Sequence, residues 1–254
     1  MIYVRTKKSH NFESDSSRGV LDDLYAENRS KKNEYSFRLK TRAGLVVDLV
    51  NTYCEDSNGL HLLDFGAAEG RTLLEINKSL VNCNFLGVEF SEELLSAAIN
   101  LPRQVRLIKG DICKLPQEIA DNSFEVITAL ACLEHLANPL AAVKEAARVL
   151  KPKGIFIATC PVPFWDEIAS KAGLLADDQH EHGLGKRELI RYVRSAGLSV
   201  VNFRRFMWAP VSFLPYLHLE VSITAALAID TFIGKLKLFD WLFVNQCIVA
   251  IKEE

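Results

Sequence analysis

The alternation of strand-like and helix-like segments is the feature that most constrains the fold of this chain. Short runs of β-branched and aromatic residues take turns with segments whose apolar residues recur every three or four positions. The strand-like runs are GLHLLDF, NFLGVEF, QVRLIKG, FEVITAL, GIFIATC and LSVVNFRRF. Because parallel neighbours need a crossover connection, strands separated by helices of this length form βαβ units. The pattern predicts a parallel sheet with helices on both faces.

Helix start signals agree with this alternation. The helix-like segments are EGRTLLEINKSL, SEELLSAAINL, NPLAAVKEAARVL and GKRELIRYVRSAG. Ser91 stands before two glutamates, and Asn138 before Pro139, which are typical N-terminal caps. The segment LKPKG is expected to end the third of these helices and turn into the next strand. An amphipathic helix is predicted from Tyr35 to Tyr53.

The domain organisation follows from where this pattern begins and breaks. Residues 1–34 read as a polar lead-in with one short helix at GVLDDLYAE, and residues 35–254 as a single α/β domain. An apolar insertion at about 206–243 interrupts the alternation, and a final strand, NQCIVAIKE, closes the chain. Glu220 and Asp230 divide its apolar runs, so none reaches the roughly 18–20 residues that span a bilayer.

Composition narrows the partners and the compartment. With 254 residues and a net charge of −2, the chain has no excess of basic residues to bind a polyanion, so nucleic acid is not expected. None of the six cysteines has zinc-type spacing, and no metal is expected. Because the sequence starts without an apolar signal segment, a cytoplasmic location is expected, with peripheral contact at a membrane surface left open.

The segment LLDFGAAEG, from Leu62 to Gly70, carries the clearest functional signal. It follows the first strand of the alternation, where parallel sheets bind ligands beyond the carboxyl ends of their strands. Gly66 and Gly70 allow positive φ and close approach of a ligand. A dinucleotide-binding turn, G-x-G-x-x-G, would also need glycines at Ala68 and Arg71. The missing glycines weigh against a pyrophosphate ligand.

Two acids favour a different ligand. Asp64 precedes the turn, where a carboxylate would repel phosphate but suits a nucleoside that carries a cation. Glu89 ends the next strand, roughly 20 residues beyond the turn, where an acid can accept hydrogen bonds from both ribose hydroxyls. Asp111 ends the third strand, close to where an adenine would lie.

These segments carry a family resemblance. LLDFGAAEG, GVEFSEELL, IKGDI, FEVITALACLEHLANP and LKPKGIFIATCP resemble, in this order, the motifs of class I S-adenosylmethionine-dependent methyltransferases. The resemblance is closest to small-molecule members similar to the quinone-pathway methyltransferases, in which an EH pair like Glu134-His135 often follows the fourth strand. Ala68 departs from the family pattern, which has a further glycine at this position. The resemblance implies a Rossmann-like, doubly wound seven-stranded sheet with an antiparallel last strand.

The resemblance also implies roles for individual residues. The cofactor would be S-adenosyl-L-methionine, with its methionine end held near Asp64, its ribose at Glu89 and its adenine near Asp111. The complete set of implied cofactor-binding residues is Asp64, Gly66, Ala67, Gly70, Glu89, Phe90, Asp111 and Ile112. Candidate catalytic bases are His135, His180 and His182.

The leading interpretation is therefore a methyltransferase that acts on a small-molecule or lipid-like acceptor. The apolar insertion could be a helical cover, a homodimer face, an acceptor pocket or an interfacial helix that meets a lipid-linked substrate. The alternative function is a non-catalytic nucleoside-binding or assembly module that docks a protein or membrane through 206–243. A nicotinamide-dependent oxidoreductase is a further alternative, but it needs the missing glycines.

Overall fold

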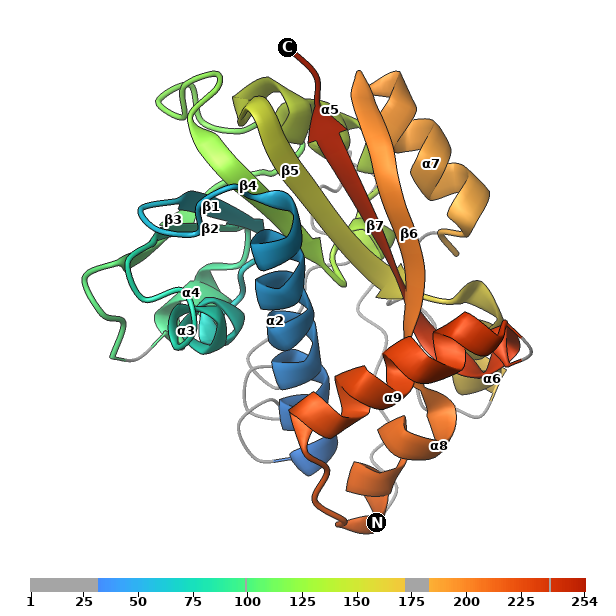
Figure 1. Cartoon of the computed structure of the whole chain (residues 1–254). Helices are drawn as coiled ribbons and strands as arrows, with labels where there is room; N and C mark the ends of the chain where they lie inside the picture. Colours follow the sequence, from blue (N-terminus) through green and yellow to red (C-terminus); the bar gives the residue numbers. More distant parts are fainter. Residues whose placement is uncertain (1–31, 99, 172–182, 238) are drawn as a thin grey trace, which may run out of the picture.

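A seven-stranded sheet forms the centre of the protein (Figure 1). The computed structural model describes residues 32–98, 100–171, 183–237 and 239–254. The strands are β1 (His61–Phe65), β2 (Asn84–Glu89), β3 (Val105–Lys109), β4 (Phe124–Leu130), β5 (Leu150–Pro161), β6 (Leu198–Trp208) and β7 (Phe243–Lys252).

The strand order is β3-β2-β1-β4-β5-β7-β6. Paired strands from β3 to β5 are parallel, whereas β7 is antiparallel to both β5 and β6. The predicted doubly wound, mostly parallel sheet with an antiparallel last strand is confirmed. Its order reverses between β1 and β4, so the chain leaves β1 at a topological switch point.

Helices cover both faces of the sheet (Figure 1). On one face α2 (Asn33–Tyr53) and α3 (Arg71–Asn77) enclose a core with the strands, and on the other face α5 (Pro139–Val149) and α7 (Lys186–Ser195) enclose a second core. Shorter helices, α4 (Glu92–Ser96) and α6 (Pro163–Lys171), follow β2 and β5. Both apolar faces of the sheet are therefore buried, as a parallel sheet requires.

The predicted helix starts are confirmed. The Ser91 hydroxyl accepts a hydrogen bond from the Leu94 N–H at 3.3 Å, and the Asn138 side chain accepts one from the Ala141 N–H at 3.2 Å. The prediction for LKPKG was wrong in part, because β5 already begins at Leu150 and includes this segment. The short helix predicted at GVLDDLYAE lies outside the described residues.

The apolar segment after β6 folds into several short helices. These are α8 (Ala209–Ser212), the 3-10 turn η2 (Leu214–Leu217), α9 (Ile223–Leu236) and the 3-10 turn η3 (Asp240–Leu242). The buried Asp230 carboxylate of α9 accepts hydrogen bonds from the N–H groups of Met207 and Trp208, at 2.7 and 2.8 Å. Because both donors lie at the end of β6, these bonds fix α9 to the sheet.

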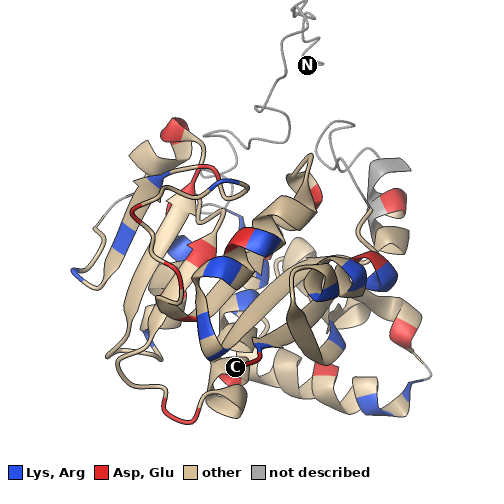
Figure 2. Ribbon diagram, turned by 90° about the horizontal axis from the view of Figure 1, so that it is seen from above, with Lys and Arg blue, Asp and Glu red and all other residues tan. Residues whose placement is uncertain are grey.

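Two surface properties bear on function. Basic and acidic residues are interspersed over the face seen in Figure 2, without an extended area of one sign among the described residues. None of the described helices is both long enough and apolar enough to cross a lipid bilayer.

Candidate cofactor site

The loop between β1 and α3, residues 66–70, lies at the switch point of the sheet. It is joined to β2 by two hydrogen bonds, in which the N–H groups of Gly66 and Ala67 donate to the Val88 carbonyl at 2.9 and 3.2 Å. The loop ends at Gly70, the N-terminal cap of α3. Sequence and structure thus place the glycine-rich loop where open α/β sheets bind their ligands.

Gly66 is required at its position for two physical reasons. Its φ of 70° lies in the left-handed region, which side chains disfavour. A Cβ atom built on it would also lie 2.6 Å from the Cys132 Sγ. The residues that follow β4 therefore press directly against the first glycine of the loop, and no larger residue fits without displacing them.

Ala68 lies where the family pattern has a glycine, and its backbone explains that pattern. Its φ is 49°, again in the left-handed region, and its side chain is buried. An L-residue in this conformation costs roughly 1–2 kcal/mol. The loop of this protein is therefore strained at a position where the family's glycine would not be.

Substituting Ala68→Gly is expected to raise the free energy of unfolding by about 0.5–1 kcal/mol. The relief of strain, roughly 1–2 kcal/mol, is offset in part by the larger chain entropy of glycine. Urea unfolding measures the change. The matched control is Ala67→Gly: Ala67 is equally buried but has no positive φ, so this change should destabilise the protein. If both substitutions destabilise equally, the strain at Ala68 does not exist.

Glu89 ties the loop to the end of β2. Its Oε2 accepts a hydrogen bond from the Ala68 N–H at 2.9 Å, and its Oε1 accepts from the N–H groups of Phe90 and Ser91 at 2.8 and 2.9 Å. A carboxylate offers roughly four acceptor positions, so about one stays open to a ligand. Glu89 can therefore hold the loop and still accept one hydroxyl of a ribose.

Asp64 is buried at the centre of the site, with 2% of its surface exposed. Its Oδ1 accepts a hydrogen bond from the Thr128 hydroxyl at 2.6 Å, and the two residues are direct partners across β1 and β4. Thr128 was not predicted as a site residue, since nothing in the sequence shows which strand lies beside β1. A buried carboxylate fixed in this way is suited to a ligand that carries positive charge.

The pKa of the Cys132 thiol is shifted by its surroundings in the site. Burial raises the pKa of its thiol well above the usual value, and the carboxylates of Glu134, Glu89 and Asp64 raise that pKa further. All three acids therefore act on one buried point behind the loop. The buried carboxylates of Asp64 and Glu89 thus lie beside the glycine loop, and such carboxylates oppose a phosphate and favour a cation.

The remaining predicted residues lie around this centre. Phe90 is partly exposed directly after β2, Ala67 is buried in the loop, and Ile112 is buried in the core beneath the end of β3. The exposed Asp111 accepts a hydrogen bond from the Cys113 N–H at 2.8 Å, which closes a local turn. Their contacts with a cofactor stay predictions.

Of the three histidines predicted as catalytic bases, only His135 is among the described residues. His135 lies in the 3-10 turn η1 (Leu133–His135) directly after β4 and is half-buried beside the fully buried Glu134. His180 and His182 lie outside the described residues. Sequence reasoning assigned no cofactor role to Cys132, although its place two residues after β4 could have suggested contact with the loop.

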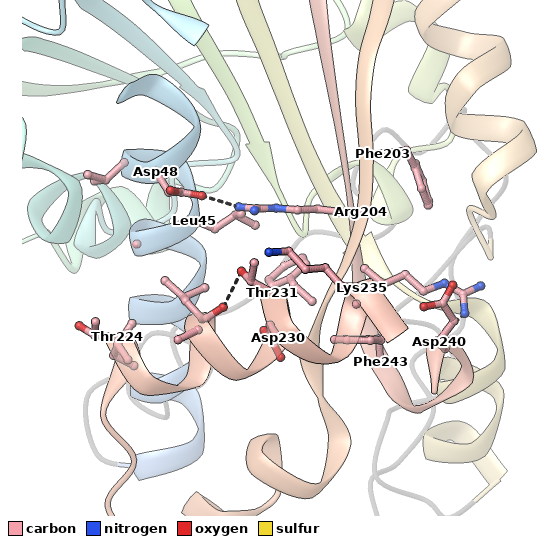
Figure 3. A pocket seen from close by; sticks show the side chains of 18 of the residues that line it. Leu45, Asp48, Phe203, Arg204, Thr224, Asp230, Thr231, Lys235, Asp240 and Phe243 are labelled. Carbon is pink, nitrogen blue, oxygen red and sulfur yellow. Dashed lines mark hydrogen bonds and ion pairs between the residues drawn. The ribbon is translucent and has the colours of Figure 1, made fainter. Parts of the chain in front are cut away.

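A separate cavity lies under α9, away from the glycine loop (Figure 3). Its volume is about 930 Å³, and it is enclosed by α2, α9 and β6. Apolar walls from Leu45 and Leu227 face Arg204, which pairs with Asp48 at 3.0 Å. Since no residue of the loop or of the end of β4 lines it, this cavity does not adjoin the candidate cofactor site.

The seven-stranded sheet and the glycine loop at its switch point together define a Rossmann-like domain. Comparisons with known proteins agree: residues 63–158 match a family model described as a methyltransferase domain. Residues 63–158 are therefore similar to methyltransferase domains. The resemblance to methyltransferases that the motifs indicated is confirmed for this region.

Individual relatives extend the similarity in sequence. The Uncharacterized methyltransferase YcgJ of Bacillus subtilis (strain 168) is 31% identical over 128 residues, 47% of this chain and 49% of the relative. The Ubiquinone biosynthesis O-methyltransferase of Azoarcus sp. (strain BH72) is 26% identical over 180 residues, 66% of this chain and 76% of the relative. The chain thus spans about half the length of the Bacillus relative.

A solved structure extends the similarity in fold. A SAM-dependent methyltransferase from Archaeoglobus fulgidus superposes with a TM-score of 0.60 at 18% identity. The match covers 91% of this chain and 100% of the other, so the similarity of fold reaches well beyond the region of the family model.

Proposed function

We propose that this protein transfers the methyl group of S-adenosyl-L-methionine to an apolar small-molecule or lipid-like acceptor. The observation that carries the proposal is the pair of buried carboxylates at the ends of β1 and β2: Asp64 is held by the Thr128 hydroxyl, and Glu89 accepts the Ala68 N–H of the glycine loop. A sulfonium cofactor brings the positive charge that such carboxylates stabilise, and when bound it supplies an electrophilic methyl group.

The protein's part in this reaction is to bind, to orient and to exclude water. We assign Asp64 and the N–H groups of the loop to the methionine end, and the open acceptor position of Glu89 to a ribose hydroxyl. Asp111 and Ile112 would border the adenine. Aligning an acceptor atom with the methyl group can lower the barrier by roughly 7–11 kcal/mol, so little further catalysis is needed.

His135 is the described residue best placed to serve as a base. It follows β4 directly, on the side of the switch point opposite Glu89, and it is half-buried. For a hydroxyl acceptor, a neutral imidazole would take the proton as the oxygen attacks the methyl group. The relative named for ubiquinone biosynthesis supports a small-molecule acceptor.

Isothermal titration with S-adenosylmethionine and S-adenosylhomocysteine, with NAD as the control, tests the cofactor part. We expect micromolar binding of both adenosyl ligands and none of NAD. Formation of S-adenosylhomocysteine with alkyl-substituted hydroquinones tests turnover. His135→Asn should lower the turnover of a hydroxyl acceptor at least tenfold and leave cofactor affinity unchanged.

The outcomes separate this proposal from its alternative. Binding of the adenosyl ligands without turnover of any acceptor would favour the non-catalytic nucleoside-binding module. Binding of NAD instead would favour an oxidoreductase, and it would contradict the reading of the acidic loop.

A further inference from the structure

The cavity under α9 has no part in the proposed methyl transfer, because it does not adjoin the glycine loop. Its volume of about 930 Å³ lies within the roughly 300–1,000 Å³ of small-molecule pockets. Figure 3 shows it between α2, β6 and α9, with Leu45 and Arg204 at its sides. The space is therefore large enough for a small organic molecule.

The walls of the cavity are largely apolar. Val47 of α2 and both Ile223 and Leu227 of α9 line it and are half-buried. The buried Leu45 and Phe206 lie beside them. Walls of this kind suit the apolar part of a ligand.

Gly234 keeps the cavity open. It lies on α9 one helical turn after Thr231 and two turns after Leu227, so the three residues share one face of the helix, and all three line the cavity. A Cβ atom built on Gly234 meets no atom within 4 Å. Glycine inside a helix costs stability relative to alanine, and no close contact requires it here. The chain thus leaves a space that a larger side chain would fill.

Basic side chains outnumber acidic ones around this space. Among the described residues that line it, the acids are Asp48, Asp230 and Asp240, and the bases are Lys186, Arg204, Arg205, Lys235 and Lys237. The lining therefore carries an excess of positive charge.

Each of the three acids already has a partner. Asp48 pairs with Arg204 at 3.0 Å. The buried Asp230 accepts the N–H groups at the end of β6, at 2.7 and 2.8 Å. Asp240 lies beside Arg205, which donates to its carbonyl at 2.6 Å. None of these carboxylates is therefore placed to neutralise the lysines of α9.

Lys235 and Lys237 form no ion pair with any carboxylate of the described chain. Figure 3 shows Lys235 and Arg204 extending from α9 and β6 into the same space. Because like charges repel, an anion between these two side chains is favoured.

We propose that this cavity binds an amphipathic organic anion, with its apolar chain along Leu227 and Gly234 and its charged head group between Lys235 and Arg204. The apolar walls take up the chain, and the excess of cations selects the head group. The site is separate from the glycine loop, so the proposal goes beyond methyl transfer and does not depend on it.

Isothermal titration of the full chain with decanoate tests the site. Decyltrimethylammonium and decanol are the matched ligands, because they carry the same chain with a cationic or a neutral head group. We expect micromolar binding of decanoate, and binding of the other two that is at least about tenfold weaker, since both lack the charge-assisted hydrogen bonds. Decyl phosphate shows which anionic head group is preferred: tighter binding than decanoate assigns a phosphate, and weaker binding a carboxylate.

Two substitutions on α9 locate the ligand. Gly234→Phe should fill the space and abolish binding, whereas Gly234→Ala adds one methyl group and should retain binding with a higher thermal midpoint. Lys235→Gln should weaken decanoate at least about fivefold by removing the charge. Its control is Lys144→Gln, an exposed lysine of α5 on the opposite face of the sheet, which should change nothing. A circular dichroism melt checks that each variant folds.

The proposal is overturned if decanoate does not bind to the wild type, or if decyltrimethylammonium binds equally well. It is overturned also if Gly234→Phe, once shown to be folded, binds decanoate as the wild type does, because the ligand then lies elsewhere.

Titration with S-adenosylhomocysteine keeps this test separate from that of the proposed function. Gly234→Phe should bind S-adenosylhomocysteine with wild-type affinity, because the cavity does not adjoin the cofactor site. If the wild type binds decanoate but no adenosyl ligand, the proposed function fails and the cavity site stands.

Discussion

Gly66→Ala is expected to destabilise the protein by about 2–4 kcal/mol. The substitution adds a side chain in the left-handed region, at roughly 1–2 kcal/mol, and forces it to within 2.6 Å of the Cys132 Sγ. Urea unfolding measures the loss, which should appear as a lower midpoint at an unchanged slope. Cofactor affinity should fall as well, since Cys132 and the loop must move apart.

Gly59→Ala is a matched control for this substitution. Gly59 has the same φ of 70°, but nothing lies within 4 Å of the Cβ it would receive. Gly59→Ala should therefore reduce the stability only by the cost of a side chain in the left-handed region, roughly 1–2 kcal/mol. Adding Cys132→Ala to Gly66→Ala should recover part of the difference, because the sulfur is removed. If Gly66→Ala and Gly59→Ala destabilised the protein equally, the close approach to Cys132 would contribute nothing to the loss of stability.

Glu89→Ala is expected to weaken binding of S-adenosylmethionine about ten- to hundredfold. One charge-assisted hydrogen bond, worth roughly 1.5–3 kcal/mol, is lost to the ligand. The Ala68 and Ser91 N–H groups lose their acceptor at the same time, so the loop should also become less ordered. Isothermal titration measures the affinity.

Glu92→Ala is the control three residues away. Glu92 is 76% exposed and pairs with Lys109 at the surface, so cofactor affinity should not change. A 2′-deoxy analogue of S-adenosylhomocysteine separates the two roles of Glu89. If the carboxylate bonds a ribose hydroxyl, the variant should lose less affinity for the deoxy analogue than for the parent. Equal losses would leave Glu89 only its role in holding the loop.

Local patterns were sufficient to predict most of the fold. The strands β1 to β4 lie within the runs that the alternation indicated, and β5, β6 and β7 overlap their predicted runs but extend beyond them. The agreement arises because the period of apolar residues reflects which face of an element is buried. The capping residues Ser91 and Asn138 act as their chemistry predicts. Helix lengths were less predictable: α4 has only five residues, far fewer than the helical pattern of its segment.

The sequence by itself determined the elements of this protein, the position of the glycine loop and the acids beside it. All of these depend on residues that are near one another in the chain. Only the tertiary structure decided that Cys132 lies against Gly66, that Thr128 binds Asp64 and that Glu89 holds the Ala68 N–H. These contacts join residues 21 to 66 positions apart, and the order of strands in the sheet brings them together.

For the apolar segment 206–243, too, the sequence determined one property and the tertiary structure another. Its composition excluded a transmembrane helix, but composition does not tell whether an apolar side chain is buried. Asp230 decides this through its bonds to the end of β6, which orient α9 so that Ala226 is covered and Phe232 faces outward. Which side of an apolar helix meets solvent is set by what it packs against, and that is a property of the folded chain.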